Sequence, residues 1–132
     1  MTPPRWLSRL VVDTIHAELL AEHGGSLGVR QGGDALIESA LGRPLQRFEY
    51  AEESDLAALA ASYLYGLVKN HGYVDGNKRV AFAAAATFLR LNHIRLTASE
   101  PEAYDRVIGI VEDRVTEEDL AAWIRTNHSS AE

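Results

Sequence analysis

The sequence predicts an all-α fold of about six helices in one compact domain. Apolar residues recur at helical spacing through most of the 132-residue chain, and residues that favour helix starts precede several of these segments. No segment shows the alternating pattern of a convincing strand. With 46% hydrophobic residues the chain is long enough to bury a real core, so we expect a single domain over residues 1–132.

The first predicted helix extends from about Ser8 to Glu22 and ends before the glycines that follow His23. The next segment, residues 24–33, contains five glycines in ten residues and must be irregular. Two interpretations of this loop stay open. It is either a surface connection or a wall of a substrate cleft, a role that loops on a rigid scaffold often have.

Asp34 is suited to cap a short helix that Gly42 and Pro44 would stop. Arg43 and Arg47 follow in this region. They either point into solvent or, if they face a cleft, hold carboxylates of a target or partner.

The third predicted helix opens at Ser54-Asp55 and continues to Asn70 with an apolar face, so that it delivers His71 at its C-terminal end. An alanine-rich helix follows over residues 77–89, and its small side chains permit close packing against neighbouring helices. Lys69, just before the connecting loop, is either a solvated lysine or a phosphate ligand.

The rest of the chain predicts two more helices. Residues 94–97 are short and extended, and we interpret them as a connection without a sheet. A helix over residues 99–113 has proline and acidic residues in its first turn, and the last helix opens at Thr116 with an approximate capping box. The polar tail, residues 127–132, is expected to be frayed.

The stretch from His71 to Arg79 has the strongest chemical signal. Gly76-Asn77 is a turn signal, and Asn77 is a predicted helix N-cap. The first turn of a helix has unpaired N–H groups and a partial positive charge, to which Lys78 and Arg79 add two cations. Each such cation costs about 0.3–1 kcal/mol at an exposed site, so the arrangement needs a compensating anion, and a nucleotide phosphate is the obvious candidate.

Two further residues of this stretch suit phosphate chemistry. Asp75 is placed to hold Mg²⁺, which takes one or two carboxylates together with phosphate oxygens and water. His71, with an ordinary pKa of about 6.5, can accept a hydroxyl proton at neutral pH. A zinc site is excluded because the sequence offers no third ligand. The other histidines are expected to be structural or solvated: His16, His23, His93 and His128.

Composition excludes several classes of protein. A net charge of −6 argues against broad nucleic-acid binding, which usually needs a basic face. The chain has no cysteines, which fits a reducing cytoplasm and excludes disulfides and thiolate metal sites. No apolar run approaches the roughly 18 residues of a membrane span, and the N-terminal residues lack the apolar stretch of a signal peptide. We therefore expect a cytoplasmic protein that binds neither membrane nor nucleic acid.

The pattern His71-x-Tyr73-x-Asp75-Gly76-Asn77-Lys78-Arg79 resembles the signature of the Fic/Doc (Fido) superfamily, and more closely its Doc branch of toxin–antitoxin toxins. In that branch the motif reads His-x-Phe-x-Asp/Asn-Ala/Gly-Asn-Lys-Arg, whereas the AMP-transferring Fic branch has a second glycine at position 78. The loop at residues 28–30 and the end of the alanine-rich helix also fit Doc-like sequences. Tyr73 replaces the usual phenylalanine, and its hydroxyl needs a partner.

The resemblance implies the Fido fold and an ATP-dependent, Mg²⁺-dependent phosphotransferase. It implies transfer of the γ-phosphate to a Ser/Thr hydroxyl of a translation factor, elongation factor Tu in the case of Doc, which would block protein synthesis. His71, Asp75, Lys78 and Arg79 would be catalytic, Asp75 would hold the metal, and the nucleotide phosphates would contact Lys69, Gly76, Asn77, Lys78 and Arg79. A Phd-like antitoxin segment would bind in the cleft, because the cis-inhibitory Fic motif is not matched at residues 14–19.

Two alternatives remain at this point. One is AMP or other nucleotide transfer, which the intact His71 and Gly76 also allow. The other is a non-catalytic adaptor that retains only the binding groove. The modified residue and the oligomeric state do not follow from the sequence.

Overall fold

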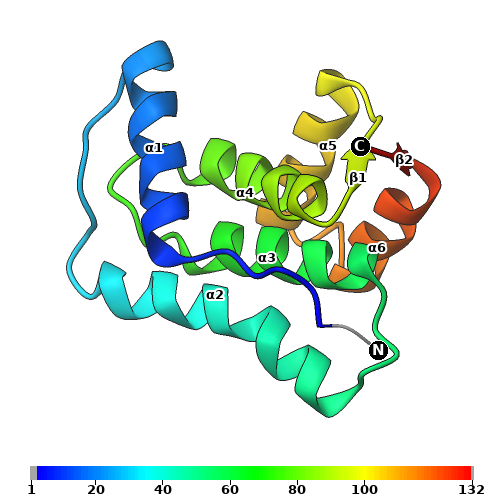
Figure 1. The fold of residues 1–132 in the computed structure, drawn as a ribbon. Coiled ribbons are helices and arrows are strands. Elements are labelled where there is room, and N and C mark those ends of the chain that lie inside the picture. The colour runs from blue at the N-terminus through cyan, green and yellow to red at the C-terminus, as the bar shows by residue number, and fades with distance from the viewer. Residues whose placement is uncertain (1–2, 132) are drawn as a thin grey trace.

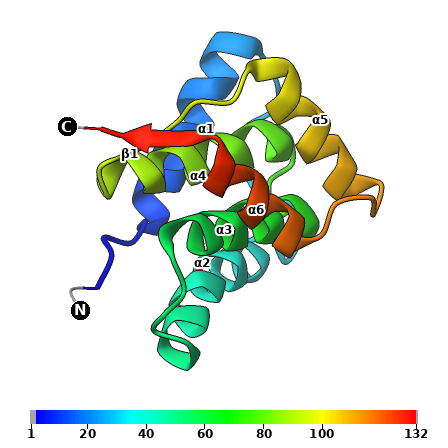
Figure 2. The same ribbon diagram turned by 90° about the vertical axis from the view of Figure 1, so that its right-hand side faces the viewer.

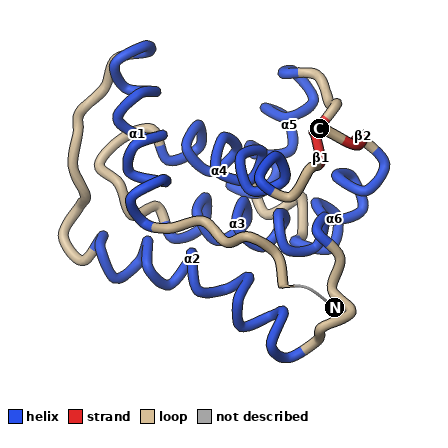
Figure 3. The backbone as a smooth tube through the Cα atoms, viewed as in Figure 1, coloured by secondary structure: helices blue, strands red, loops and turns tan. Residues whose placement is uncertain are grey.

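The computed structural model describes residues 3–131 (Figure 1). Within these residues it has six helices and two short strands, as Figure 3 shows by colour: α1 (Arg9–His23), α2 (Gly33–Tyr50), α3 (Leu56–Asn70), α4 (Asn77–Leu91), β1 (Ile94–Leu96), α5 (Glu100–Val111), α6 (Glu117–Thr126) and β2 (His128–Ser130). The connection from α1 to α2, residues 24–32, is a long loop. The mostly helical fold predicted from the sequence is confirmed and is consistent with the Fido fold.

Helix α3 is the centre of the core. Nearly every residue from Ala57 to Val68 is buried, because α2, α4 and α6 all pack on this helix. Figures 1 and 2 both show α3 between α2 and α4. Small residues permit this close packing: a Cβ atom added at Gly66 would lie 3.4 Å from the Cβ of Ala40 on α2. The central helix is therefore held rigidly on several sides, and so is the residue that it delivers at its C-terminal end.

Helix α2 is longer than the sequence predicted. The prediction of a short helix stopped by Gly42 and Pro44 is wrong, because α2 continues to Tyr50 with Pro44 inside it. A proline in a helix removes one hydrogen bond. Here the proline side chain is fully buried in a face that also includes Ile37 and Leu41. Packing on the central helix overrides the local signal.

The C-terminal tail also differs from its prediction. Residues 94–96 and 128–130 form a two-stranded antiparallel sheet, in which Arg95 is paired with Ser129. The backbone N–H of Ala131 donates to the carbonyl oxygen of His93 at 2.8 Å, which extends this pairing. The prediction of a connection without a sheet and of a frayed tail is therefore wrong over the residues that the structure describes. Local sequence carried no signal because each strand has only three residues.

Four helices start where the sequence predicted, whereas Asp34, predicted as a cap, is the second residue of α2, whose N-cap is Gly32. The side chains of Ser8, Asp55, Ser99 and Thr116 each accept a hydrogen bond from the backbone at the start of a helix. The start of α6 has the complete capping box with Asp119. Across residues 3–131, no helix combines the length and the apolarity that crossing a bilayer requires.

Candidate active site

His71 lies at the C-terminal cap of α3, as the sequence predicted. Its backbone is in the left-handed region (φ 50°, ψ 52°), which costs an L-residue about 1–2 kcal/mol. Its imidazole is exposed, lines a cleft of about 620 Å³ and has no hydrogen-bond partner within residues 3–131. The central helix thus brings an unpaired imidazole to the cleft.

The start of α4 forms one end of the cleft. Gly76 is the N-cap, in the left-handed region (φ 77°, ψ 13°), and no side chain caps this helix. The first hydrogen bond of the helix runs from Val80 N–H to the carbonyl of Gly76 at 2.9 Å. Among the described residues, no acceptor is bonded to the backbone N–H groups of Asn77, Lys78 and Arg79, which line the cleft. Three unpaired N–H groups at a positive helix end make an anion-binding site.

Lys78 and Arg79 add their charges to this end of the helix. Both side chains are exposed, both line the cleft, and neither pairs with a carboxylate within the described residues. Cations at a positive helix end are unfavourable, and an anion bound between them would remove that cost. The predicted juxtaposition of two cations with the start of the alanine-rich helix is present in the structure.

Asp75 lies between the imidazole and the anion site. Its carboxylate is exposed in the cleft and accepts hydrogen bonds from Gly76 N–H at 2.9 Å and Ser26 N–H at 3.4 Å. The described residues contain no cluster of three or more side chains that could hold a metal ion by themselves. One carboxylate beside an anion site nevertheless fits Mg²⁺ that arrives with a nucleotide, because that ion keeps phosphate and water ligands. Asp75 is the residue that would hold it.

Asn77 has a different role from the one predicted. It is the first residue of α4 and not its N-cap, so that prediction is wrong by one position. Its buried side chain accepts from Tyr73 N–H and donates to the carbonyl of Tyr73, both at 2.9 Å. The amide therefore closes the loop between the two helices instead of capping the helix that follows. Only the backbone of Asn77 is left to contact a phosphate.

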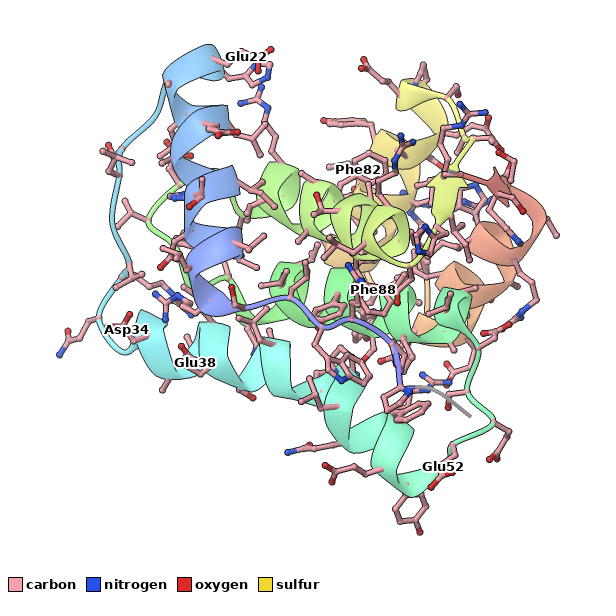
Figure 4. All side chains as sticks on the ribbon, viewed as in Figure 1. Glu22, Asp34, Glu38, Glu52, Phe82 and Phe88 are labelled. Atoms are coloured by element: carbon pink, nitrogen blue, oxygen red, sulfur yellow. The ribbon has the colours of Figure 1, made fainter. Side chains whose placement is uncertain are left out.

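Tyr73 has the partner that its hydroxyl requires. The hydroxyl donates to Asp13 Oδ1 at 2.5 Å, and the ring is buried. Burial, and then the Asp13 carboxylate, raise the pKa of Tyr73 far above its ordinary value, so the hydroxyl stays a donor. Asp13 also accepts from Arg9, which reaches Asp34 and Glu38 on α2; Figure 4 labels these two acids.

The glycine-rich segment, residues 24–33, supports the loop from outside the cleft. Arg30 N–H donates to the carbonyl of Gly72, and Val74 N–H donates to the carbonyl of Gly28, both at 3.0 Å. A Cβ atom at Gly33 would collide with the carbonyl oxygen of Gly72, so this close approach requires glycine. No residue of the segment lines the cleft. It is neither the predicted wall nor a plain connection.

The comparisons with known proteins agree with this site. Residues 6–89 match the family model described as "Fic/DOC family". The chain belongs to the Fic/DOC family. It is 32% identical over 118 residues to "Protein kinase doc" of Escherichia phage P1, covering 89% of this chain and 91% of that protein. It is 46% identical over 77 residues to "Toxin Doc" of Mycolicibacterium smegmatis, covering 57% of each.

Three cations of this Fic/DOC chain for which the sequence left a binding role open do not line the cleft. Lys69, predicted as a phosphate ligand, pairs with Asp113 and is absent from the cleft wall, so its position does not support that role. Arg43 and Arg47 both pair with Glu117 and are likewise absent. Each of these side chains has a carboxylate partner, in contrast to Lys78 and Arg79.

Sequence analysis missed the opposite wall of the Fic/DOC cleft. Besides the loop and α4, residues of α1 and α5 line the cleft. Figure 1 shows these two helices on opposite sides of α4. The lining there is largely apolar: Tyr104 is 68% exposed, and Phe82, labelled in Figure 4, is half-buried. His23 and Glu100 are its charged or titratable residues, although His23 was expected to be structural or solvated. Only the packing of α5 beside α4 brings these residues together.

Proposed function

We propose that this chain is a Doc-type toxin that acts as a protein kinase. It transfers the γ-phosphoryl group of ATP to a Ser/Thr hydroxyl of a translation factor, elongation factor Tu being the first candidate. The names of two relatives, "Protein kinase doc" and "Toxin Doc", support the activity and the toxin role. Transfer to a translation factor would stop protein synthesis.

One observation of the site carries the proposal. Within residues 3–131, the start of α4 has three N–H groups without an acceptor and two cations without a carboxylate, and the residues that carry them line one cleft with His71. A nucleotide triphosphate supplies the negative charge that this end of the helix lacks. Phosphoryl transfer asks a protein mainly for positioning and charge stabilisation, and this site offers both.

The proposed reaction forms one P–O bond and breaks another. The target hydroxyl oxygen attacks the γ-phosphorus, the bond from this phosphorus to the β–γ bridging oxygen breaks, and ADP leaves. A ring nitrogen of His71 accepts the hydroxyl proton. Lys78 and Arg79 stabilise the charge on the transferred group. Mg²⁺ held by Asp75 would neutralise phosphate charge when it is bound.

The side chain at position 78 favours γ-transfer. In the family pattern, the AMP-transferring branch has glycine where this chain has Lys78. A lysine side chain fills the space that this glycine leaves open, and the Doc branch is associated with the inverted nucleotide placement that exposes the γ-phosphorus. AMP transfer from the α-phosphorus is the competing reaction.

Labelled ATP distinguishes these reactions. We expect that incubation of the chain and Mg²⁺ with elongation factor Tu transfers label from γ-labelled ATP and none from α-labelled ATP. Transfer of α-label would replace the kinase proposal by nucleotidyl transfer. If neither label reaches the factor, the test is repeated with a lysate of ribosome-associated factors as substrate. Absence of label transfer in that lysate would overturn the enzymatic proposal in favour of an adaptor.

An antitoxin segment is the proposed partner of the apolar wall. The exposed Tyr104 and the half-exposed Val74 both line the cleft and suit the apolar face of an amphipathic peptide. We expect expression of the chain alone to arrest growth and co-expression with a Phd-type antitoxin to restore it. Tyr104→Ala should weaken that rescue while label transfer is retained. Harmless expression of the chain alone would contradict the toxin role.

A further inference from the structure

His16 of α1 is a buried histidine outside the cleft that contacts the back of the anion-binding loop. Only 3% of its surface is exposed, and it does not line the cleft. Its Nε2 lies 2.7 Å from the carbonyl oxygen of Asp75, which is 59 positions further along the chain. Because a carbonyl only accepts, Nε2 must be the protonated nitrogen that donates this hydrogen bond.

The Asp75–Gly76 peptide needs such a contact. Gly76 has no Cβ, so sterics restrict the rotation of this peptide only weakly. With its carbonyl turned to the buried imidazole, the peptide keeps its partial negative charge away from the cleft. A carbonyl that turned toward the start of α4 would compete with an anion for the N–H groups there. The orientation of one peptide therefore affects the whole anion site.

The imidazole of His16 is itself fixed. It stacks on the ring of Tyr73 with centroids 3.8 Å apart and planes 15° apart. The hydroxyl of Tyr73 is bonded to Asp13, one turn before His16 on the same helix, and Asp13 is bonded to Arg9 at 2.9 Å. A buried donor held between the fixed ring of Tyr73 and a carbonyl has little freedom to move.

We propose that His16 is a positioning residue for the anion site, which holds the Asp75–Gly76 peptide so that its carbonyl points away from the bound phosphate. The effect on catalysis rests on the proposed phosphotransfer, whereas the effect on the peptide does not. His16 contacts neither nucleotide nor target, and acts through the loop that binds them.

Two substitutions separate this role from simple core packing. His16→Phe keeps the ring and its stack on Tyr73 but loses the donor. His16→Gln loses the ring but carries an amide nitrogen at a similar distance from the backbone, and can donate to Asp75. A role in packing alone predicts that Phe is the better replacement. The positioning role predicts that Gln is.

The first measurement is the affinity for ATP with Mg²⁺ by titration calorimetry. We expect His16→Phe to weaken ATP binding about tenfold or more, because the Asp75 carbonyl loses its donor and the loop can reorient, and His16→Gln to recover most of the loss. Tyr63→Phe is the matched control, since it removes another buried hydrogen bond, to Leu7 N–H at 3.1 Å, away from the cleft. It should leave the ATP affinity unchanged.

The second measurement needs no ligand. The backbone amide nitrogen of Gly76 is bonded to the carbonyl carbon that His16 holds, so its NMR shift reports this hydrogen bond. We expect the Gly76 resonance to move in His16→Phe, to return toward wild type in His16→Gln, and to stay unchanged in Tyr63→Phe.

The two measurements fail in different ways. If wild-type protein does not bind ATP, the proposed function is overturned, and the Gly76 resonance alone judges the positioning role. If wild type binds ATP and His16→Phe binds it equally well with an unmoved Gly76 resonance, the positioning role is overturned and the proposed function stands. Better ATP binding by His16→Phe than by His16→Gln also contradicts the positioning role.

Discussion

Helices α3 and α4 have 15 residues each and pack side by side, yet their N-termini are opposite in chemistry. The first turn of α3 is capped by Asp55, which accepts from Ala58 N–H at 2.9 Å and pairs with Arg125 at 2.6 Å. The first turn of α4 has a glycine cap, no side-chain acceptor and two cations. The start of α3 finds an anionic acceptor in Asp55, whereas the start of α4 has none among residues 3–131.

A similar contrast separates the two ends of α4. The cleft at its start has a volume of about 620 Å³ and contains charged side chains without partners. A second cavity of about 550 Å³ lies near its C-terminal end; on its wall Asp55 pairs with Arg125, whereas Arg5 has no carboxylate partner among residues 3–131. Size does not distinguish the two. The first differs in that its unpaired cations lie at a helix start without a side-chain cap, where a bound anion is stabilised.

The largest expected difference concerns two matched histidines. His71 and His93 are both exposed and both have a left-handed backbone (φ 50° and 67°), but they lie near opposite ends of α4. We expect His71→Ala to reduce phosphotransfer by about 10²–10⁴-fold, because the proton acceptor is lost, and His93→Ala to have no effect. The transfer of γ-label measures both. Equal activity of the two variants would remove His71 from the mechanism.

A second difference concerns matched cations. We expect Arg79→Ala or Lys78→Ala to lower the efficiency of phosphotransfer by about 10²-fold, because each removes a cation that stabilises the negative charge on the transferred phosphoryl group. Arg125→Ala should leave the efficiency unchanged. Each of the first two variants should also raise the free energy of unfolding by about 0.3–1 kcal/mol, because a cation leaves a positive helix end. Urea unfolding checks this opposite sign. A loss of both activity and stability would contradict the anion-site interpretation.

A substitution at the capped start of α3 should lower stability and leave ligand binding unchanged. Asp55→Ala should cost about 0.5–2 kcal/mol of stability, as loss of an N-cap does, and leave ATP affinity unchanged. The hydrogen bond from Arg125 holds the pKa of Asp55 below its ordinary value. A depressed pKa contributes stability above the unfolded value of about 3.9 and loses it as pH falls through the folded value. Between pH 6 and pH 3, the melting temperature should therefore fall less steeply for Asp55→Ala than for wild type.

The smallest expected effect is a gain of stability. His71→Gly should stabilise the protein by up to about 1 kcal/mol, because glycine adopts the left-handed backbone without the cost that an L-residue bears. His93→Gly should give a similar gain, as its φ is also positive. Only the first should abolish phosphotransfer. If His71→Gly is less stable than wild type, the imidazole has a structural role that the contacts of His71 do not indicate.

The chemistry of the site was predictable because it is contiguous. His71, Asp75, Lys78 and Arg79 lie within nine positions, and a helix end on either side of a short loop must keep them close. Lys69 was assigned to the phosphate site on the same proximity, but it lies on another face of α3 and pairs with Asp113. Closeness in the chain does not give the direction of a side chain on a helix.

By itself, the sequence determined four helix starts and the chemical groups of the motif, since a capping side chain and the backbone N–H that donates to it are three residues apart and act locally. Tertiary structure alone decided which distant residues support the motif. The extension of α2 past Pro44, the pairing of residues 94–96 with 128–130, and the bonds from Asp13 to Tyr73 and from His16 to Asp75 all join distant parts of the chain. Such contacts form only when the core brings the segments together, and no local pattern specifies them.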